Sequence, residues 1–191
     1  MKASPISIYL NDRLYDFDLD EALTRLSPQR REQALRFRHE QGRRECAAAY
    51  LLLCQGLRQE YGITQPPVFE YGEHGKPAIV GHPEIHFNLS HCREAAICVL
   101  SDRPVGVDVE CLRSFDESLF RYTMNEQEQA QIQAAEFPNL EFIRLWTRKE
   151  AVAKLAGTGI TNDLKHLLDC PPRMLHTVVA PNQSYVYSYC Q

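Results

Sequence analysis

The sequence predicts a mixed α/β protein, because short stretches of alternating apolar residues are interleaved with stretches of helical periodicity. Residues 105–110 read Val-Gly-Val-Asp-Val-Glu, and this strict alternation is typical of a strand. Residues 142–155 carry apolar side chains at helical spacing on one side. Hydrophobic residues make up 44% of the chain and charged residues 24%, which is ordinary globular usage. A chain of 191 residues can bury a good core as one domain or as two small packed ones.

The N-terminal half is expected to hold an early strand, a long helical region and a group of strands. Apolar residues alternate over residues 4–10, although Pro5 weakens the start of that strand. Ser27-Pro28 is a typical helix opening, with serine as the cap and proline at the first helical position. The helical region continues to about residue 61 with a break placed at Gly42, and Gly62 ends it. Three further strands are predicted, at residues 68–71, 85–89 and 95–100.

The C-terminal half follows a similar order. The strand at residues 105–110 precedes a mostly helical stretch at 115–137, with Asn125 as a cap-like residue inside it, and the helix at 142–155. A terminal hairpin is compatible with residues 178–179 and 185–189. Each half therefore shows an early strand, one or more helices and later strands.

Composition argues against several classes of protein. The net charge of −4 disfavours a general nucleic-acid binder, whose footprint is usually basic. The longest apolar run, residues 47–54, is far short of the ~20 residues of a spanning helix. Asn11 and Asp12 come too early for a signal peptide with a proper apolar region. The seven cysteines are odd in number and form no C-x-x-C pair, so we expect reduced thiols in a cytoplasmic protein.

Two carboxylates share one face of the strand at residues 105–110. Because side chains alternate along a strand, Asp108 and Glu110 lie together with Gly106, roughly 7 Å apart along the strand. The three valines point to the other face, which suits burial. Gly106 is expected to leave room for a ligand beside the carboxylates. The alternative is that Asp108 and Glu110 form the solvated face of an edge strand.

An acid and a base share one flank of the helix at residues 142–155. Glu150 and Lys154 are four residues apart, so they lie one turn from each other. Oxygen ligands without an accompanying cysteine or histidine pair favour Mg²⁺ or Mn²⁺ over zinc, and the lysine supplies a charge complementary to phosphate. The alternative is an ordinary surface ion pair between Glu150 and Lys154, worth ~0.3–0.5 kcal/mol.

Four motifs, in order, resemble those of the 4′-phosphopantetheinyl transferases. Gly106-Val-Asp108 and the segment Trp146-Thr-Arg-Lys-Glu-Ala-Val-Ala-Lys154 are similar to that family's paired signature, G-(I/V)-D followed by W-x-x-K-E-(A/S)-x-x-K. Upstream, Gly75-Lys-Pro77 and Phe87-Asn-Leu-Ser-His91 resemble two more of its motifs. The resemblance covers about residues 27–160 and points to the Sfp-like, pseudo-dimeric branch.

The resemblance implies a fold and an activity. The fold is α/β (α+β), with two similar α/β lobes in a pseudo-two-fold arrangement: residues 1–102 bind the nucleotide of coenzyme A, and residues 103–191 carry the metal and the catalytic residues. The activity is Mg²⁺-dependent transfer of the 4′-phosphopantetheine arm from coenzyme A to a serine of an apo acyl or peptidyl carrier protein, with release of 3′,5′-ADP. A monomer is expected, with no nucleic-acid or membrane partner.

The resemblance also implies roles for individual residues. Asp108, Glu110 and Glu150 hold the metal, Glu150 acts as the base, and Lys154 stabilises the phosphate and contacts coenzyme A. The further residues implied in coenzyme A binding are Arg30, Arg44, Lys76, Ser90 and His91. Gln33 stands where relatives often carry a second basic residue. Glu126 matches a position that in relatives approaches the metal through water. Lys149 lies beside the apolar stripe of its helix, so a structural role is an alternative for it.

Two other functions are compatible with these residues. A catalytically silent module that binds coenzyme A or a carrier protein would keep the fold while losing acids, and all three acids are present. Another Mg²⁺-dependent phosphoesterase would use the same acids but would not need the upstream coenzyme A motifs.

Overall fold

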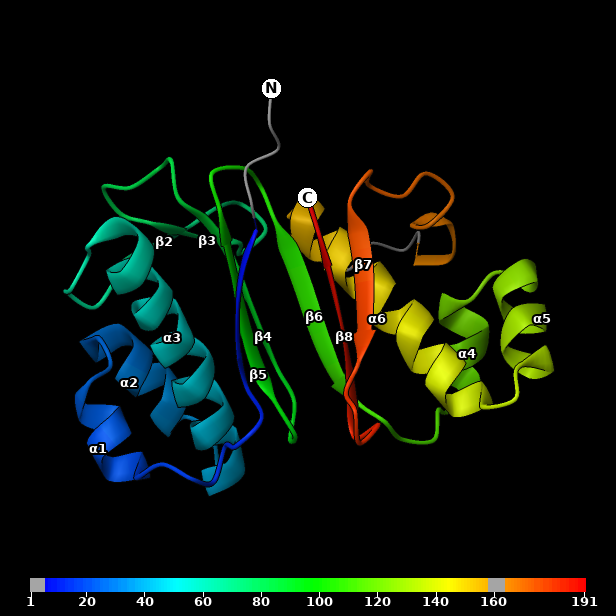
Figure 1. Ribbon diagram of the computed structural model, residues 1–191, viewed down its shortest axis with the longest axis horizontal. Helices are drawn as coiled ribbons and strands as arrows, with labels where there is room; N and C mark the ends of the chain where they lie inside the picture. Colours follow the sequence, from blue (N-terminus) through cyan, green and yellow to red (C-terminus); the bar gives the residue numbers. More distant parts are fainter. Residues whose placement is uncertain (1–5, 158–163) are drawn as a thin grey trace.

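The computed structural model describes residues 6–157 and 164–191 and has a mixed α/β architecture, as the sequence predicts (Figure 1). Three small antiparallel sheets form its centre. The first has the order β1 (Ser7–Asn11), β5 (Ala96–Ser101), β4 (His86–His91), and the second pairs β2 (Phe69–Tyr71) with β3 (Pro77–Ile79). The third has the order β6 (Gly106–Cys111), β8 (Tyr185–Cys190), β7 (Leu175–Val179). Ser4 and Pro5, at the start of the first predicted strand, lie outside the described residues.

Three helices lie on one side of the first sheet: α1 (Leu19–Thr24), α2 (Pro28–Leu35) and α3 (Glu40–Tyr61) (Figure 1). The predicted start of α2 is confirmed, since the Ser27 hydroxyl accepts a hydrogen bond from the Arg30 amide and Pro28 is the first helical residue. The predicted end of α3 is confirmed at Gly62, which has a left-handed conformation with φ 67°.

The break predicted at Gly42 is wrong. The chain leaves the helical conformation between α2 and α3, at residues 36–39, and Gly42 lies inside α3. A Cβ atom at this position would come within 2.6 Å of the Phe37 ring. The glycine therefore allows Phe37 to pack closely on the first turn of α3, and it does not interrupt the helix.

The other helices cover the third sheet and its outer side. They are α4 (Glu117–Thr123), α5 (Glu126–Ala134) and α6 (Pro138–Ala156), followed by a short 3-10 turn, η1 (Leu164–His166). Asn125 caps α5, as predicted: its side chain accepts a hydrogen bond from the Glu128 amide, and the Glu128 carboxylate accepts one from the Asn125 amide. Helix α6 packs against β6 and β8 and ends at Gly157, with φ 68°.

The first and third sheets meet along β4 and β6, which contact each other (Figure 1). Two side chains of β4 reach the backbone of β6 at this junction. Asn88 Oδ1 accepts a hydrogen bond from the Val107 amide at 2.9 Å, and Ser90 Oγ accepts one from the Val109 amide at 3.2 Å. Side chains of β4 therefore fix the position of β6 relative to the first sheet.

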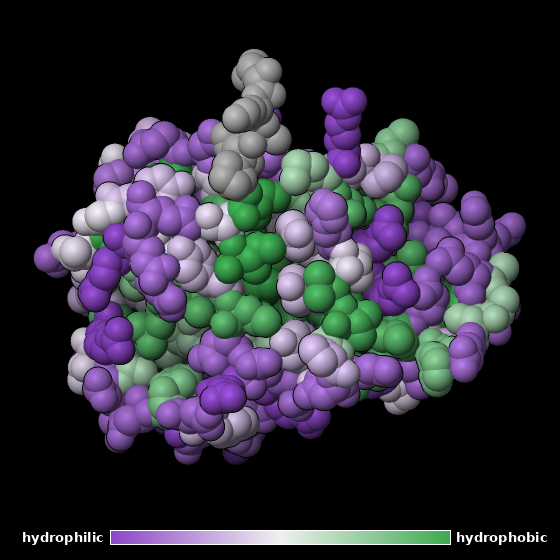
Figure 2. All heavy atoms as spheres, viewed as in Figure 1, coloured by the Kyte–Doolittle hydropathy of each residue, from purple (hydrophilic) through white to green (hydrophobic). Residues whose placement is uncertain are grey.

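The valines of β6 lie in an apolar core on the opposite face. Val107 and Val109 are buried there beside Ile97 and Val99 of β5, as the alternation predicts. Figure 2 shows apolar side chains gathered along the middle of the molecule, over β1 and β8. Within residues 6–157 and 164–191, no helix combines the length and the apolar character that crossing a membrane requires.

Candidate active site

The carboxylate face of β6 packs toward α6. Asp108 is only 4% exposed, so the alternative of a solvated edge-strand face is wrong. The space expected beside Gly106 is not open to a ligand either. A Cβ atom at Gly106 would lie 2.0 Å from the Ala151 carbonyl oxygen and 2.6 Å from the Leu155 amide nitrogen. The backbone of α6 fills this position, and the glycine permits that close approach.

Helix α6 brings Lys154 to Asp108 of β6. The Lys154 ammonium donates a hydrogen bond to Asp108 Oδ1 at 2.6 Å. Lys154 therefore pairs across the helix–strand contact and does not form the alternative surface pair with Glu150. Glu150 lies one turn earlier on the same flank. One more turn earlier, the Trp146 indole N–H donates to Glu110 Oε1 at 3.3 Å.

The electrostatics of the site favour protonated or cation-bound carboxylates. Burial, followed by the negative charge of Asp108, raises the pKa of Glu150 to about 7, although Lys154 acts in the opposite direction. Burial and Asp108 also raise the pKa of Glu110. Three carboxylates thus interact in a poorly solvated space. The positive charge nearby is too small to keep the pKa values of Glu110 and Glu150 in their ordinary range.

Two carboxylate oxygens in this space are buried and have no hydrogen-bond partner in the described part of the chain: Asp108 Oδ2 and Glu150 Oε1. Unpartnered buried oxygens of this kind are costly unless a cation satisfies them. Carboxylate oxygens are also the ligands that Mg²⁺ and Mn²⁺ prefer. Among the described residues, no three acidic, histidine or cysteine side chains are already gathered as a finished metal site, and the Lys154 ammonium lies against Asp108 instead. The donor set therefore fits a hard cation that would take up part of the role of Lys154.

A cleft of about 340 Å³ opens beside Glu150 and Lys154. It lies between the loop that joins β2 to β3, strand β4 and helix α6. Its lining residues are His74, Gly75, Lys76, Pro77, Asn88, Leu89, Glu150, Ala153, Lys154 and Gly157. Parts of both upstream motifs therefore line the same cleft as Glu150 and Lys154: the Gly-Lys-Pro segment and the Asn-Leu pair.

Lys76 is anchored at the C-terminal end of α6. Its ammonium donates to the carbonyl oxygens of Lys154 at 2.8 Å and Leu155 at 2.9 Å, and to that of Val105 at 3.3 Å. Burial lowers its pKa. A cation at a helix C-terminus is favourably placed, because the last carbonyl groups lack helical partners. Lys76 thus ties the β2–β3 loop to the C-terminal end of α6.

The neighbouring residues Ser90 and His91 have different surroundings. The Ser90 hydroxyl donates to Asp108 Oδ1 at 2.9 Å and accepts from the Lys154 ammonium at 3.1 Å. His91 Nδ1 lies 3.1 Å from Glu45 Oε2 on α3. Burial raises the pKa of Glu45, but the hydrogen bonds with His91 and Gln41 outweigh it and the net shift is downward. Ser90 belongs to the carboxylate cluster, whereas His91 faces α3.

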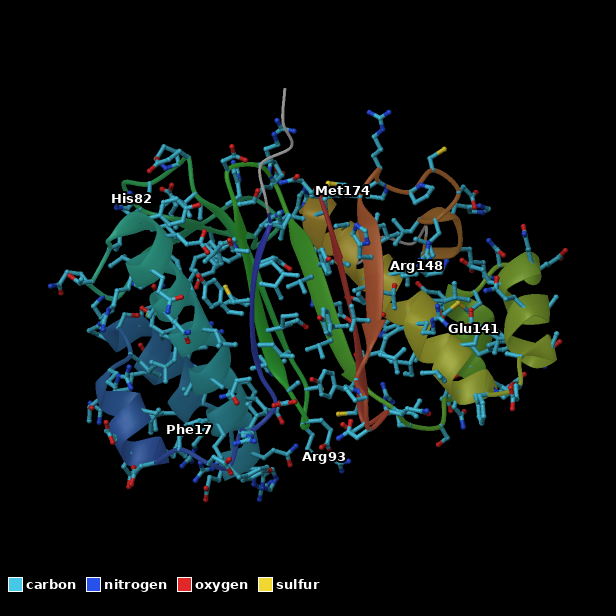
Figure 3. The ribbon with its side chains drawn as sticks, in the orientation of Figure 1. Phe17, His82, Arg93, Glu141, Arg148 and Met174 are labelled. Atoms are coloured by element: carbon cyan, nitrogen blue, oxygen red, sulfur yellow. The ribbon has the colours of Figure 1, made fainter. Side chains whose placement is uncertain are left out.

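The structure does not bring Arg44 to the carboxylates. Its guanidinium donates to the Phe17 carbonyl at 2.7 Å and to Glu40 at 2.7 Å, and it lies 5.4 Å from the centre of the Phe17 ring. Figure 3 labels Phe17, which lies near the end of the layer formed by α1 and α3. Arg44 therefore holds the chain between β1 and α1 against α3.

Arg30 is similarly bonded within its own layer. It donates to the Gln33 side chain at 2.9 Å and to the Cys46 carbonyl at 3.4 Å, and its guanidinium lies over the Tyr50 ring. Its Nε atom is buried and has no partner among the described residues. The Gln33 side chain thus orients Arg30.

Lys149 has surroundings that suit a structural role. Its side chain is fully buried, and its ammonium lies 2.8 Å from Glu128 Oε1 and donates to the Leu164 carbonyl at 2.8 Å. It connects α6 to the start of α5 and to η1. Glu126 is the first residue of α5 and is exposed.

Sequence reasoning assigned no role to Trp146, although its position carried a signal. Trp146, Glu150 and Lys154 follow one another at intervals of four residues, so all three lie along one flank of α6. The indole ring stacks on Phe142 at 6.5 Å and 4°, which fixes the direction of its N–H group. Trp146 thus orients the Glu110 carboxylate.

Comparisons with known proteins give a consistent family. A model of the 4′-phosphopantetheinyl transferase superfamily matches residues 104–180, which contain the carboxylates and Lys154. The 4′-phosphopantetheinyl transferase Sfp of Bacillus subtilis strain 168 is 26% identical over 157 residues, covering 81% of this chain and 70% of that protein. A 4′-phosphopantetheinyl transferase of Bacillus pumilus is 29% identical over 158 residues, covering 81% and 68%.

A third relative matches a shorter stretch with higher identity. The 4′-phosphopantetheinyl transferase AcpT of Salmonella typhimurium is 39% identical over 101 residues, covering 50% of this chain and 52% of that protein. These relatives all carry the same enzyme name, and the matched family segment holds the acid–base cluster described above. Residues 104–180 thus match the model of the 4′-phosphopantetheinyl transferase superfamily, and over 81% of its length the chain is similar to proteins of that name.

Proposed function

We propose that the cluster of Asp108, Glu110, Glu150 and Lys154 is where this chain performs 4′-phosphopantetheinyl transfer from coenzyme A to a serine of an apo acyl or peptidyl carrier protein. The observation that carries the proposal is a pair of buried oxygens, Asp108 Oδ2 and Glu150 Oε1, that have no hydrogen-bond partner among the described residues and lie beside a lysine and an open cleft. This arrangement suits a reaction in which the protein positions charged groups and stabilises charge.

The three carboxylates would hold Mg²⁺, with Mn²⁺ as a substitute. Asp108 and Glu110 come from β6 and Glu150 from α6, so the cation would be held between strand and helix. When bound, it would neutralise charge on the pyrophosphate of coenzyme A and on the leaving 3′,5′-ADP. The Trp146 indole would keep Glu110 Oε1 in place, and the cation would compete with Arg113, whose guanidinium lies 4.0 Å from Glu110 Oε2.

Glu150 would serve as the general base. A serine hydroxyl needs a base at neutral pH because its own pKa is far too high for ionisation. In the metal-free protein the pKa of Glu150 is raised to about 7, and a bound cation would favour its ionised form, which can accept the serine proton. The serine proton would pass to Glu150 as the hydroxyl oxygen forms its bond to phosphorus, and 3′,5′-ADP would leave.

Lys154 would turn from Asp108 toward the transferring phosphate. Its side chain is 30% exposed and lines the cleft, so its ammonium has access to a ligand there. The cleft would take the phosphate end of coenzyme A, with Lys76 close by at the end of α6. Arg30, Arg44 and His91 remain proposed contacts of the nucleotide, and each would have to exchange a present protein partner for a phosphate oxygen.

We also propose that residues 1–102 and 103–191 form two similar lobes about a pseudo-two-fold axis, within a monomer. The support is a shared plan. Each lobe has a three-stranded antiparallel sheet whose central strand is the last of the three in the chain, and each sheet packs against one long helix, α3 or α6.

The test is a transfer assay read by intact mass. The purified chain is incubated with coenzyme A, Mg²⁺ and a panel of apo carrier proteins, with and without a chelator. We expect one carrier to gain the mass of a single phosphopantetheine arm, in the absence of chelator only, and Asp108→Asn to abolish the gain. Hydrolysis of coenzyme A without transfer would overturn the proposal in favour of a phosphoesterase. Binding of coenzyme A with no transfer to any carrier would overturn it in favour of a silent module.

A further inference from the structure

Ser90 occupies the junction between the two larger sheets. It lies on β4, is 7% exposed, and its Oγ atom accepts a hydrogen bond from the Val109 amide of β6. Asn88, two residues earlier, makes the equivalent bond to the Val107 amide. The two residues therefore join the sheets in the same way, but only Ser90 also contacts the carboxylate cluster.

The hydrogen-bonding capacity of the Ser90 hydroxyl is fully used. A serine hydroxyl has one proton to donate and two lone pairs to accept with. Ser90 donates its proton to Asp108 Oδ1 at 2.9 Å, and it accepts from the Lys154 ammonium at 3.1 Å and from the Val109 amide at 3.2 Å. A phosphate oxygen needs a donor, and the single donor of Ser90 is bonded to Asp108.

We propose that Ser90 is a positioning residue of the carboxylate site and does not bind a phosphate of coenzyme A through its hydroxyl. This inference rests on the proposed cation site. Asp108 Oδ1 is held by Ser90 and Lys154, whereas Oδ2 is buried and has no partner in the described part of the chain. Fixing the first oxygen sets the plane of the carboxylate, and the second oxygen is then presented to the cation. Partners of this kind orient metal ligands, and their loss typically costs 10–100-fold in metal affinity.

The arrangement also connects the cation site to the junction of the sheets. The same hydroxyl that orients Asp108 accepts the Val109 amide of β6, so the position of β4 relative to β6 sets the orientation of Asp108. Removal of the Ser90 hydroxyl should therefore weaken cation binding more than removal of the Asn88 side chain, which weakens only the junction between the sheets.

The test uses Ser90→Ala and, as a second variant of similar volume with only a weak donor, Ser90→Cys. Asn88→Ala is the matched control, because it removes the equivalent bond to β6 without touching Asp108. The first measurement is the Mn²⁺ dissociation constant of the protein alone, by calorimetry. We expect an increase of about 10–100-fold for the Ser90 variants and a value near wild type for Asn88→Ala. This measurement does not require transfer activity, so it stands even where the proposed transfer fails.

The second measurement compares coenzyme A with 3′-dephospho-coenzyme A as the donor in the transfer reaction. A positioning role predicts that Ser90→Ala lowers the efficiency with both donors by the same factor and raises the Mg²⁺ concentration needed for half-maximal rate. A role in binding the 3′-phosphate predicts that the preference for coenzyme A over the dephospho form collapses. Unchanged Mn²⁺ affinity in both Ser90 variants, or a collapsed preference, would overturn the inference.

Discussion

The Lys154 ammonium lies 2.6 Å from Asp108 Oδ1, at the centre of the cluster that we propose to hold a cation. In the protein alone, lysine thus satisfies the carboxylate that a metal would also need. An ammonium and a metal ion compete for the same negative charge, because each would be repelled by the other at short range.

This relationship predicts opposite effects of one substitution on metal binding and on transfer. In Lys154→Met, Mn²⁺ should bind the coenzyme-A-free protein about tenfold more tightly, equivalent to about 1.4 kcal/mol, because the competing charge is gone. Transfer should fall, because the phosphate loses its stabilising ammonium. Calorimetry and a transfer assay measure the two effects, and Lys165→Met, which removes an exposed lysine, is the control. Weaker metal binding in Lys154→Met would show that the lysine supports the cation site and does not compete with the cation.

Glu150 predicts how stability depends on pH in the presence of a chelator. Its carboxyl keeps a proton up to a pH of about 7 when folded, against an ordinary value of 4.5, so the folded state binds more protons between these values. The contribution of Glu150 to the free energy of unfolding is therefore complete below pH 4.5, and it is lost as the pH rises through about 7. Glu110, whose pKa is also raised, acts in the same direction.

The measurement is the free energy of unfolding in urea at about pH 5 and about pH 8, for wild type and Glu150→Gln. The variant carries no titrating group at this position, so its stability should fall less between the two pH values. Equal pH dependence in both proteins would mean that Glu150 titrates normally in the folded state.

Gly106 predicts a steric effect of a single methyl group. Gly106→Ala would place a Cβ atom 2.0 Å from the Ala151 carbonyl oxygen, so α6 would have to move away from β6. We expect a loss of about 1–3 kcal/mol or more in stability and a loss of transfer. Gly72→Ala is the matched control, because the nearest atom to its added Cβ is 3.8 Å away. Urea unfolding compares the two, and equal stability in both would contradict the close approach of α6.

Lys149 and Glu128 form a buried ion pair with side chains that are 0% and 9% exposed. Lys149→Met should cost about 3–5 kcal/mol, because it leaves the Glu128 charge buried without compensation. The exposed pair of Arg121 and Glu117 on α4 provides the control, and Arg121→Met should cost less than about 1 kcal/mol. The double variant with Glu128→Gln should recover part of the loss, and a double variant less stable than the single one would speak against the pair.

Much of the fold followed from local patterns in the sequence. The alternation of residues 105–110 placed Asp108 opposite the buried valines, and the spacing of Glu150 and Lys154 placed them on one flank of α6. Ser27, Gly62 and Asn125 marked helix ends correctly because capping depends on neighbouring residues. Caps and side-chain periodicity depend on residues close in the sequence, so they predict helix ends and buried faces well.

The remaining features depend on contacts between distant segments. Lys76 bonds to carbonyls 78 and 79 positions away, and the Ser90 hydroxyl meets Lys154 across 64 positions. Strand β3 and helix α1 are short and were not predicted, since three to six residues carry little periodicity. Gly42 and Gly106 were interpreted as a break and as open space, whereas each is a point of close packing that only the tertiary structure reveals.

The cation site itself can be tested with the single tryptophan of the chain. The Trp146 indole donates to Glu110, so a cation that binds Glu110 should change the tryptophan fluorescence. We predict a saturable change on Mg²⁺ titration of wild type, retained in Asp20→Asn, which removes an exposed acid, and lost in Asp108→Asn. An equal response in wild type and Asp108→Asn would contradict the claim that Asp108, Glu110 and Glu150 hold the metal.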